Sequence, residues 1–346
     1  MTTGALLMMM AGAAVPSAGS TVIAVAHNGS PFISVYAWSG SGFGTKFSNP
    51  STLPASDAKG TAFTSDGSAI AVSHNGSPFI SVYAWSGSGF GTKFSNPSTL
   101  PTGNAKGTAF TSDDSAIAVA HNTSPRISVY AWSGSGFGTK FSNPSPLPAS
   151  NAGGTTFTSD DSAIAVTHAG SPYTSVYRWS GSGFGSKFAN PSPALSSTAE
   201  EAAFTSDDSA ISIAWGGFPY FSVYAWSGSG FGSKFADPSI LPPIAGIGTA
   251  FISDDSAVAV ASALSPRISV YAWSGSGFGS KFADPSPPPA STGLGTAFTS
   301  DGSAIAVSHS GSPFISVYAW SGSGFGTKFS NPSTLPASDA GAVDFN

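Results

Sequence analysis

Short apolar segments alternate with turn-forming segments along the chain. Between Gly60 and Pro97, apolar segments at 60–63, 68–74, 79–85 and 90–94 are separated by the sequences TSDG, NGSP and SGSG. Asp-Gly, Asn-Gly and Gly-Ser-Gly supply the positive φ angles that tight hairpin turns require. The pattern predicts four antiparallel strands in this stretch, named strands a to d in chain order.

Strand b, at 69–72, is apolar on both faces. Because side chains alternate along a strand, Ala69 and Ala71 share one face, and Ile70 and Val72 share the other. We expect the bulky face of one sheet to pack on the small face of its neighbour. Strand d carries a lysine in every copy, which we expect at the outer edge, where it hinders pairing with another chain.

The whole pattern recurs with a period of 47 residues. The sequence WSGSGFG begins at Trp38 and again at positions 85, 132, 179, 226, 273 and 320, so every step is 47 residues. Four strands per repeat at this period are typical of a β-propeller blade. The sequence therefore predicts an all-β protein, a single seven-bladed propeller of four-stranded antiparallel blades over residues 20–346.

The two ends of the repeat region complement each other. A shift of 6 × 47 = 282 residues places Phe63 on Phe345, so the C-terminal sequence GAVDFN is an eighth strand a. A shift back by 47 places Phe63 on Pro16, so the first blade lacks this strand. We expect the C-terminal strand to pair with residues 22–25 and close the ring. Phe345→Ala is then expected to cost about 3 to 5 kcal/mol, as for a buried aromatic side chain.

Composition limits the choice of partners. Charged residues make up 8% of the chain, the net charge is −5, and no basic cluster is present, so we expect no nucleic-acid partner. The chain has no cysteine, which excludes disulfides and thiol chemistry. We also expect no cofactor, no metal site and no membrane span, since the apolar run at 5–15 is too short to cross a bilayer.

The repeat resembles a WD40-type blade in the wider sense. The resemblance rests on residues 62–87, AFTSDGSAIAVSHNGSPFISVYAWSG, although the Gly-His pair and the Trp-Asp dipeptide of that family are absent. The sequences AVSHNGSPFISVY and FSNPSTLP are more similar to near-identical tandem propellers encoded in bacteriophage and prophage genomes, among virion and tail genes. This resemblance implies a virion context.

Differences between copies concentrate in the b–c and d–a loops, which lie on one face of such a disc. The residue after the b–c proline and the residue that ends strand b supply aromatic, cationic and imidazole groups, which are common anchors at binding surfaces. The candidate binding residues are Phe32, Phe79, Arg126, Tyr173, Trp215, Tyr220, Arg267, Phe314, His27, His74, His121, His168 and His309. Drift in tolerant loops explains the same variation.

Titratable residues form no evident catalytic set, and we name no catalytic residue. The five histidines occupy one blade position, so a ring places them too far apart for one metal ion, and a structural role is favoured. Paired aspartates such as Asp113-Asp114 are interpreted as turn formers. Glu200 and Glu201, the two glutamates of the chain, are interpreted as part of a solvated loop.

Residues 1–19 precede the repeats and are interpreted as an apolar tail. Docking of this tail on a partner through Leu6, Leu7, Met8, Met9 and Met10 is one possibility, and packing on its own disc is the other.

Three functions remain open. The favoured one is a non-enzymatic phage virion component, either a capsid decoration or a tail protein, which has other virion proteins as partners and is located in the virion. The second is a free, extracellular lectin-like module that binds host surface glycans. The third is an enzyme with a site at the central channel. It ranks lowest because the ring has little asymmetry; the fifth repeat, with Glu200, Glu201, Trp215 and Tyr220, departs most from the others.

Overall fold

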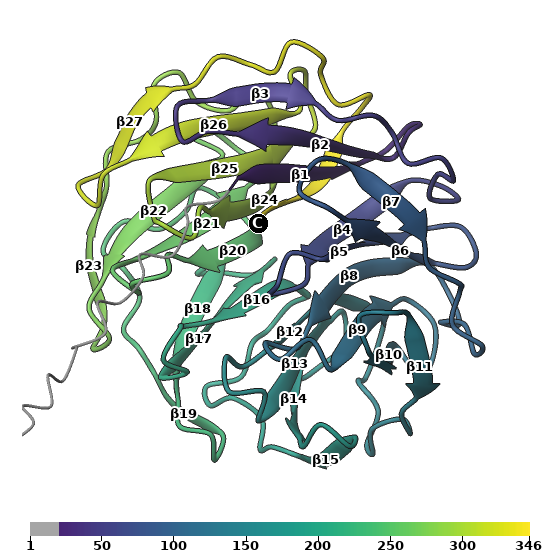
Figure 1. Cartoon of the computed structure of the whole chain (residues 1–346). Helices are drawn as coiled ribbons and strands as arrows, with labels where there is room; N and C mark the ends of the chain where they lie inside the picture. Colours follow the sequence, from purple (N-terminus) through teal and green to yellow (C-terminus); the bar gives the residue numbers. More distant parts are fainter. Residues whose placement is uncertain (1–20) are drawn as a thin grey trace, which may run out of the picture.

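The computed structural model describes residues 21–346, and the regular elements in this range are β-strands. Seven four-stranded antiparallel sheets are arranged in a ring (Figure 1). The predicted seven-bladed propeller is thus confirmed. Within the same range, no helix is long and apolar enough to cross a membrane.

Each blade contributes one strand to each of four concentric positions, and the blades are numbered 1 to 7 in the order of their strands b. The innermost strands, strands a, are β28 (Ala340–Phe345), β4 (Ala58–Phe63), β8 (Ala105–Phe110), β12 (Ala152–Phe157), β16 (Ala199–Phe204), β20 (Gly246–Phe251) and β24 (Gly293–Phe298). Strands b are β1 (Val22–His27), β5 (Ala69–His74), β9 (Ala116–His121), β13 (Ala163–His168), β17 (Ala210–Trp215), β21 (Ala257–Ser262) and β25 (Ala304–His309). Strands c are β2 (Ile33–Trp38), β6 (Ile80–Trp85), β10 (Ile127–Trp132), β14 (Thr174–Trp179), β18 (Phe221–Trp226), β22 (Ile268–Trp273) and β26 (Ile315–Trp320). The outermost strands, strands d, are β3 (Phe43–Lys46), β7 (Phe90–Lys93), β11 (Phe137–Lys140), β15 (Phe184–Lys187), β19 (Phe231–Lys234), β23 (Phe278–Lys281) and β27 (Phe325–Lys328).

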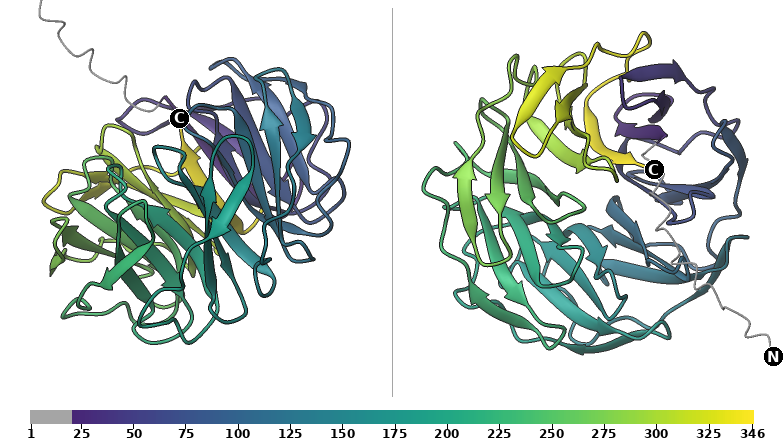
Figure 2. Two further views of the ribbon diagram at one scale, coloured as in Figure 1. Left: turned by 90° about the horizontal axis from the view of Figure 1, so that it is seen from below. Right: turned by 60° about the vertical axis from the view of Figure 1, so that its left-hand side comes forward.

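The C-terminal strand closes the ring as predicted. β28 pairs antiparallel with β1, with Val343 opposite Val25 and Phe345 opposite Ile23. Figure 2 shows this last strand next to the first blade. Phe345 is half-buried, and the ring of Trp38 lies edge-on to it at a centroid distance of 5.6 Å. The expected cost of its truncation stays a prediction, and incomplete burial favours the lower end of that range or less.

Neighbouring blades pack through the two unlike faces of strand b. Ile70 and Val72 of blade 2 lie in one buried cluster with Ala24 of blade 1. Ile23 and Val25 of blade 1 lie in another cluster with Ala304 of blade 7. The bulky face of each blade thus contacts the small face of the preceding blade, as the alternation in the sequence predicts.

The recurring tryptophan joins consecutive blades. The ring of Trp85 in blade 2 lies edge-on to Phe47 of blade 1 at a centroid distance of 5.1 Å, and to Phe90 of its own blade at 5.1 Å. Such edge-to-face pairs contribute about 0.5 to 1.5 kcal/mol beyond the apolar area they bury. The turn after Trp85 needs glycine, because Gly87 and Gly89 have φ angles of 74° and 151°. The sequence WSGSGFG is therefore a structural unit of the blade.

Candidate functional site

The loop-face candidates lie around the b–c turns and outside the axial channel. Those that follow the loop proline have positive φ angles between 68° and 79° and are half-buried: Phe32, Phe79, Arg126, Tyr173, Tyr220, Arg267 and Phe314. Trp215 is buried. No finding tests whether these residues bind a partner, so that remains a prediction. The anchoring candidates Leu6, Leu7, Met8, Met9 and Met10 lie outside the described residues.

The candidate histidines are buried beneath this face. Nε2 of His74 lies 3.0 Å from Oγ of Ser81 on the neighbouring strand, and the same pair recurs in the other histidine-bearing blades: His27 with Ser34, His121 with Ser128, His168 with Ser175 and His309 with Ser316. Burial lowers the pKa of His74 to about 4. These histidines are neutral at physiological pH, and each one joins strand b to strand c.

The second aspartate of each pair links two blades. Oδ1 of Asp114 accepts a hydrogen bond from the backbone N–H of Ser65 at 2.8 Å, and Oδ2 accepts one from the Ser65 hydroxyl at 2.7 Å. Asp161, Asp208 and Asp255 make the same contacts with the preceding blade. The first aspartate caps its own turn, as in the bond from Ser115 N–H to Asp113. Both carboxylates therefore serve the structure of the ring.

The innermost strands enclose an axial cavity of about 490 Å³, which is within the range of small-molecule sites. Near the start of these strands the register with strand b shifts, as between Ala58 and Gly60 in β4 and between Ala199 and Glu201 in β16. A bulge leaves one residue out of the ladder and redirects its side chain. In the cavity wall, the residues at this bulge position are Gly341, Lys59, Lys106, Gly153, Glu200, Ile247 and Leu294.

The interpretation of Glu200 and Glu201 as a solvated loop is wrong. Both residues belong to β16, and both line the cavity. The equivalent of Glu201 in blade 2 is Gly60, where a Cβ would lie 2.8 Å from the carbonyl oxygen of Lys106. On blade 6, Glu201 faces Gly248, where an added Cβ would lie 3.0 Å from Oε2 of Glu201, so a glycine there leaves room for the carboxylate.

The carboxyl group of Glu201 has a pKa close to neutral pH. Its Oε2 accepts one hydrogen bond, from the backbone N–H of Thr249 at 3.1 Å. Burial raises its pKa to about 7, and the charge of Asp344 acts in the same direction. Oδ2 of Asp344 accepts a hydrogen bond from the backbone N–H of Phe63 at 3.0 Å. Burial raises the pKa of Asp344 to about 6. A carboxyl group with this pKa exchanges protons readily at physiological pH.

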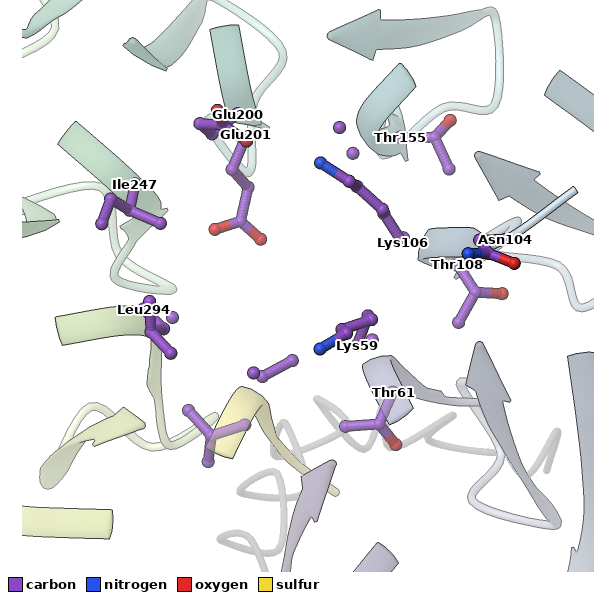
Figure 3. A pocket seen from close by; sticks show the side chains of 18 of the residues that line it. Lys59, Thr61, Asn104, Lys106, Thr108, Thr155, Glu200, Glu201, Ile247 and Leu294 are labelled. Atoms are coloured by element: carbon purple, nitrogen blue, oxygen red, sulfur yellow. The ribbon is translucent and has the colours of Figure 1, made fainter. Parts of the chain in front are cut away.

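Two lysines face this carboxyl group across the cavity. Figure 3 shows the ammonium groups of Lys59 and Lys106 and the carboxylate of Glu201 pointing into the same space. Nζ of Lys59 donates a hydrogen bond to Oδ1 of Asn28 at 2.6 Å, which orients its side chain. Lys106 is exposed to the cavity. The site thus combines a carboxyl group that can act as a base with two cations.

Sequence reasoning missed these residues although their signal was present. The other seven lysines of the chain recur every 47 residues in strand d, at positions 46, 93, 140, 187, 234, 281 and 328, whereas Lys59 and Lys106 fall outside that series. In the sequence, Lys59 and Lys106 fall in the variable loop expected between strands d and a. The structure places them inside strands, at the bulge position, which lines the cavity in every blade.

No family model and no curated protein sequence matches the chain. Solved structures match it over nearly its whole length. The chain is similar to the periplasmic gluconolactonase PpgL of Pseudomonas aeruginosa, with a TM-score of 0.66, 12% identity and coverage of 94% of this chain and 98% of that one. It is also similar to a protein of Bacteroides uniformis assigned as a 6-phosphogluconolactonase, with a TM-score of 0.71, 11% identity and coverage of 94% and 99%. A protein of Bacteroides fragilis with the same assignment gives a TM-score of 0.70, 10% identity and coverage of 95% and 98%.

These comparisons correct the expected function. At 10% to 13% identity they show the shared propeller fold alone. The proteins named above are lactonases by name, and not virion components, so the expected role in a phage particle is overturned. The symmetry of the ring is also no reason to rank an enzyme lowest, because the channel holds an unsymmetrical set of side chains.

Proposed function

We propose that the axial channel is the active site of a hydrolase that opens small anionic lactones. One observation carries the proposal: the carboxyl group of Glu201, with a pKa of about 7, shares a cavity with Lys59 and Lys106. The similarity of the fold to proteins named as lactonases supports the choice of reaction.

The residues present match the needs of lactone hydrolysis. The Glu201 carboxylate takes a proton from water, and the resulting hydroxide adds to the lactone carbonyl carbon. The positive charge of Lys106 stabilises the oxyanion that forms. The ring C–O bond then breaks, and the leaving alkoxide takes the proton back from Glu201. Lys59, oriented by Asn28, binds the anionic group of the substrate.

Lactone hydrolysis releases a carboxylic acid, so a pH-stat measures it directly. The substrates to test are 6-phosphogluconolactone and a dihydrocoumarin that carries a carboxylate. We expect Glu201→Gln to lower kcat/KM at least about 100-fold, as for loss of a general base. Lys106→Met is expected to lower it by a similar factor, as for loss of an oxyanion donor.

Matched controls remove charges of the same sign at the outer rim. Asp284→Asn is the control for the glutamate and Lys140→Met is the control for the lysine. Lys140 ends a strand d, Asp284 follows one, and both side chains make local contacts. Both control variants should keep full activity. If neither lactone is hydrolysed faster than in buffer, or if Glu201→Gln retains the wild-type rate, the proposal is wrong.

A further inference from the structure

The bulge residues divide the cavity wall into two unlike sides. Lys59 and Lys106 belong to the neighbouring blades 2 and 3, whereas Ile247 and Leu294 belong to the neighbouring blades 6 and 7. In a ring of seven, blades 2 and 3 face blades 5 to 7 across the axis. Figure 3 shows the two apolar side chains on the side of the cavity opposite the lysines. The wall is cationic at blades 2 and 3 and apolar at blades 6 and 7, with Glu200 and Glu201 of blade 5 next to the apolar side.

Two threonine hydroxyls on the apolar side are already engaged within the protein. Next to Ile247 on β20, the hydroxyl of Thr249 is paired with Oγ of Ser212 at 2.8 Å. On β24, the hydroxyl of Thr296 donates to the carbonyl oxygen of Ala306 at 3.0 Å. A ligand that lies on this side therefore meets half-buried alkyl groups and no free threonine hydroxyl from these two residues.

We propose that the substrate of this channel is an amphiphilic lactone, with an anionic group on one side and an alkyl or aryl group on the other. This inference rests on the proposed hydrolase function and names its substrate class. An alkyl or aryl group leaves water when it contacts Ile247 and Leu294, which is favourable. A polyhydroxylated ring in the same place loses hydrogen bonds to water without replacing them.

The experiment compares two anionic lactones, one with an aryl group and one with hydroxyl groups. Because they also differ in anionic group and leaving group, each kcat/KM is divided by the rate constant of the same lactone in buffer. The carboxylated dihydrocoumarin presents an aryl group, and 6-phosphogluconolactone presents hydroxyl groups. Hydrolysis is followed by pH-stat, and the binding of the corresponding lactam analogues is measured by titration calorimetry. We expect the aryl compound to have at least a tenfold higher kcat/KM and a tenfold lower Kd.

Substitutions of Ile247 and Leu294 test whether the apolar side causes the preference for the aryl lactone. Ile247→Gly and Leu294→Gly introduce the residue that blades 1 and 4 carry at this position, and together they should reduce the preference to less than threefold. Ile247→Thr keeps a side chain in case the glycine variant fails to fold, and should reduce the preference in the same direction. The control is Ile240→Thr, because Ile240 is 59% exposed and does not line the cavity.

The two proposals fail in different ways. Tight binding of the aryl lactam without hydrolysis of either lactone would support the ligand class and overturn the hydrolase. Hydrolysis that depends on Glu201 but shows equal rates for both lactones would support the hydrolase and overturn the ligand class. A preference for the aryl compound that survives both apolar-side substitutions would also overturn the ligand class.

Discussion

Oε2 of Glu201 accepts the backbone N–H of Thr249 at 3.1 Å, and this bond crosses from blade 5 to blade 6. Asp344 makes the same kind of contact between blades 1 and 2, where its Oδ2 accepts the N–H of Phe63 at 3.0 Å. In each case a carboxyl group binds an amide of the next inner strand, and burial opposes its ionisation. The ring therefore holds two carboxyl groups that destabilise it when they ionise.

Replacement of Glu201 should stabilise the protein above neutral pH. The folded-state pKa is raised from 4.5 to about 7, so the folded state binds the proton more tightly than the unfolded chain. The resulting stabilisation is full below pH 4.5 and is lost as the pH rises through 7. Glu201→Gln should therefore be about 1 to 3 kcal/mol more stable than the wild type at pH 8, and similar to it at pH 4.

Urea denaturation at the two pH values measures this difference. Asp284→Asn, which removes a carboxylate at the outer rim, provides the control. A Glu201→Gln variant less stable than the wild type at pH 8 would show that the ionised carboxylate is favourable in the channel, contrary to the assigned pKa.

The buried histidines should make the protein sensitive to acid. Burial lowers the pKa of His74, His121, His168 and His309 from 6.5 to about 4. The unfolded chain binds protons at a higher pH than the folded chain does, so stability is full above pH 6.5 and is lost as the pH falls toward 4. Each histidine should contribute about 2 to 3 kcal/mol to this loss.

His74→Gln tests this prediction because glutamine keeps a donor near Ser81 but does not titrate in this range. We expect the variant to lose less stability than the wild type between pH 6.5 and 4, as measured by urea denaturation. The control is Asn75→Gln, which changes the adjacent turn residue and leaves the histidine in place. An equal loss in the variant and the wild type would contradict a buried neutral histidine.

Most of the fold follows from the sequence, but the site does not. The 47-residue period sets the number of blades, and the match of Phe345 to Phe63 sets the closure. These inferences hold because every copy repeats the same local pattern. The channel wall depends on the bulge residue of each inner strand and on its neighbour Glu201 in β16, and a bulge shifts the alternation from which side-chain directions are inferred. Lys59 and Glu200 therefore resembled variable loop residues.

The aspartate links between blades should contribute measurably to stability. Asp114 accepts three hydrogen bonds from Ser65 and Asp66 of the preceding blade. Asp114→Gly removes the carboxylate and suits the φ angle of 55°, as glycine does at the equivalent Gly67 and Gly302. We expect a loss of about 1 to 2 kcal/mol in the free energy of unfolding, and a smaller loss for Asp114→Asn, which keeps one acceptor. A glycine variant as stable as the wild type would show that solvent replaces these bonds without cost.

Closure by the C-terminal strand is tested by Phe345→Ala. Phe345 is half-buried against Trp38, and its strand is joined to the rest of blade 1 by hydrogen bonds and side-chain packing alone. We expect a loss of about 1 to 3 kcal/mol in the free energy of unfolding, less than for a fully buried phenylalanine.

The matched control is Phe63→Ala, which removes the equivalent contact with Trp85 in a blade whose four strands are consecutive in the chain. Because β28 can detach without breaking a connection, Phe345→Ala should lower the melting temperature at least as much as Phe63→Ala does, and it should increase amide hydrogen exchange in β1 and β28 selectively. An unchanged melting temperature would refute closure through this strand.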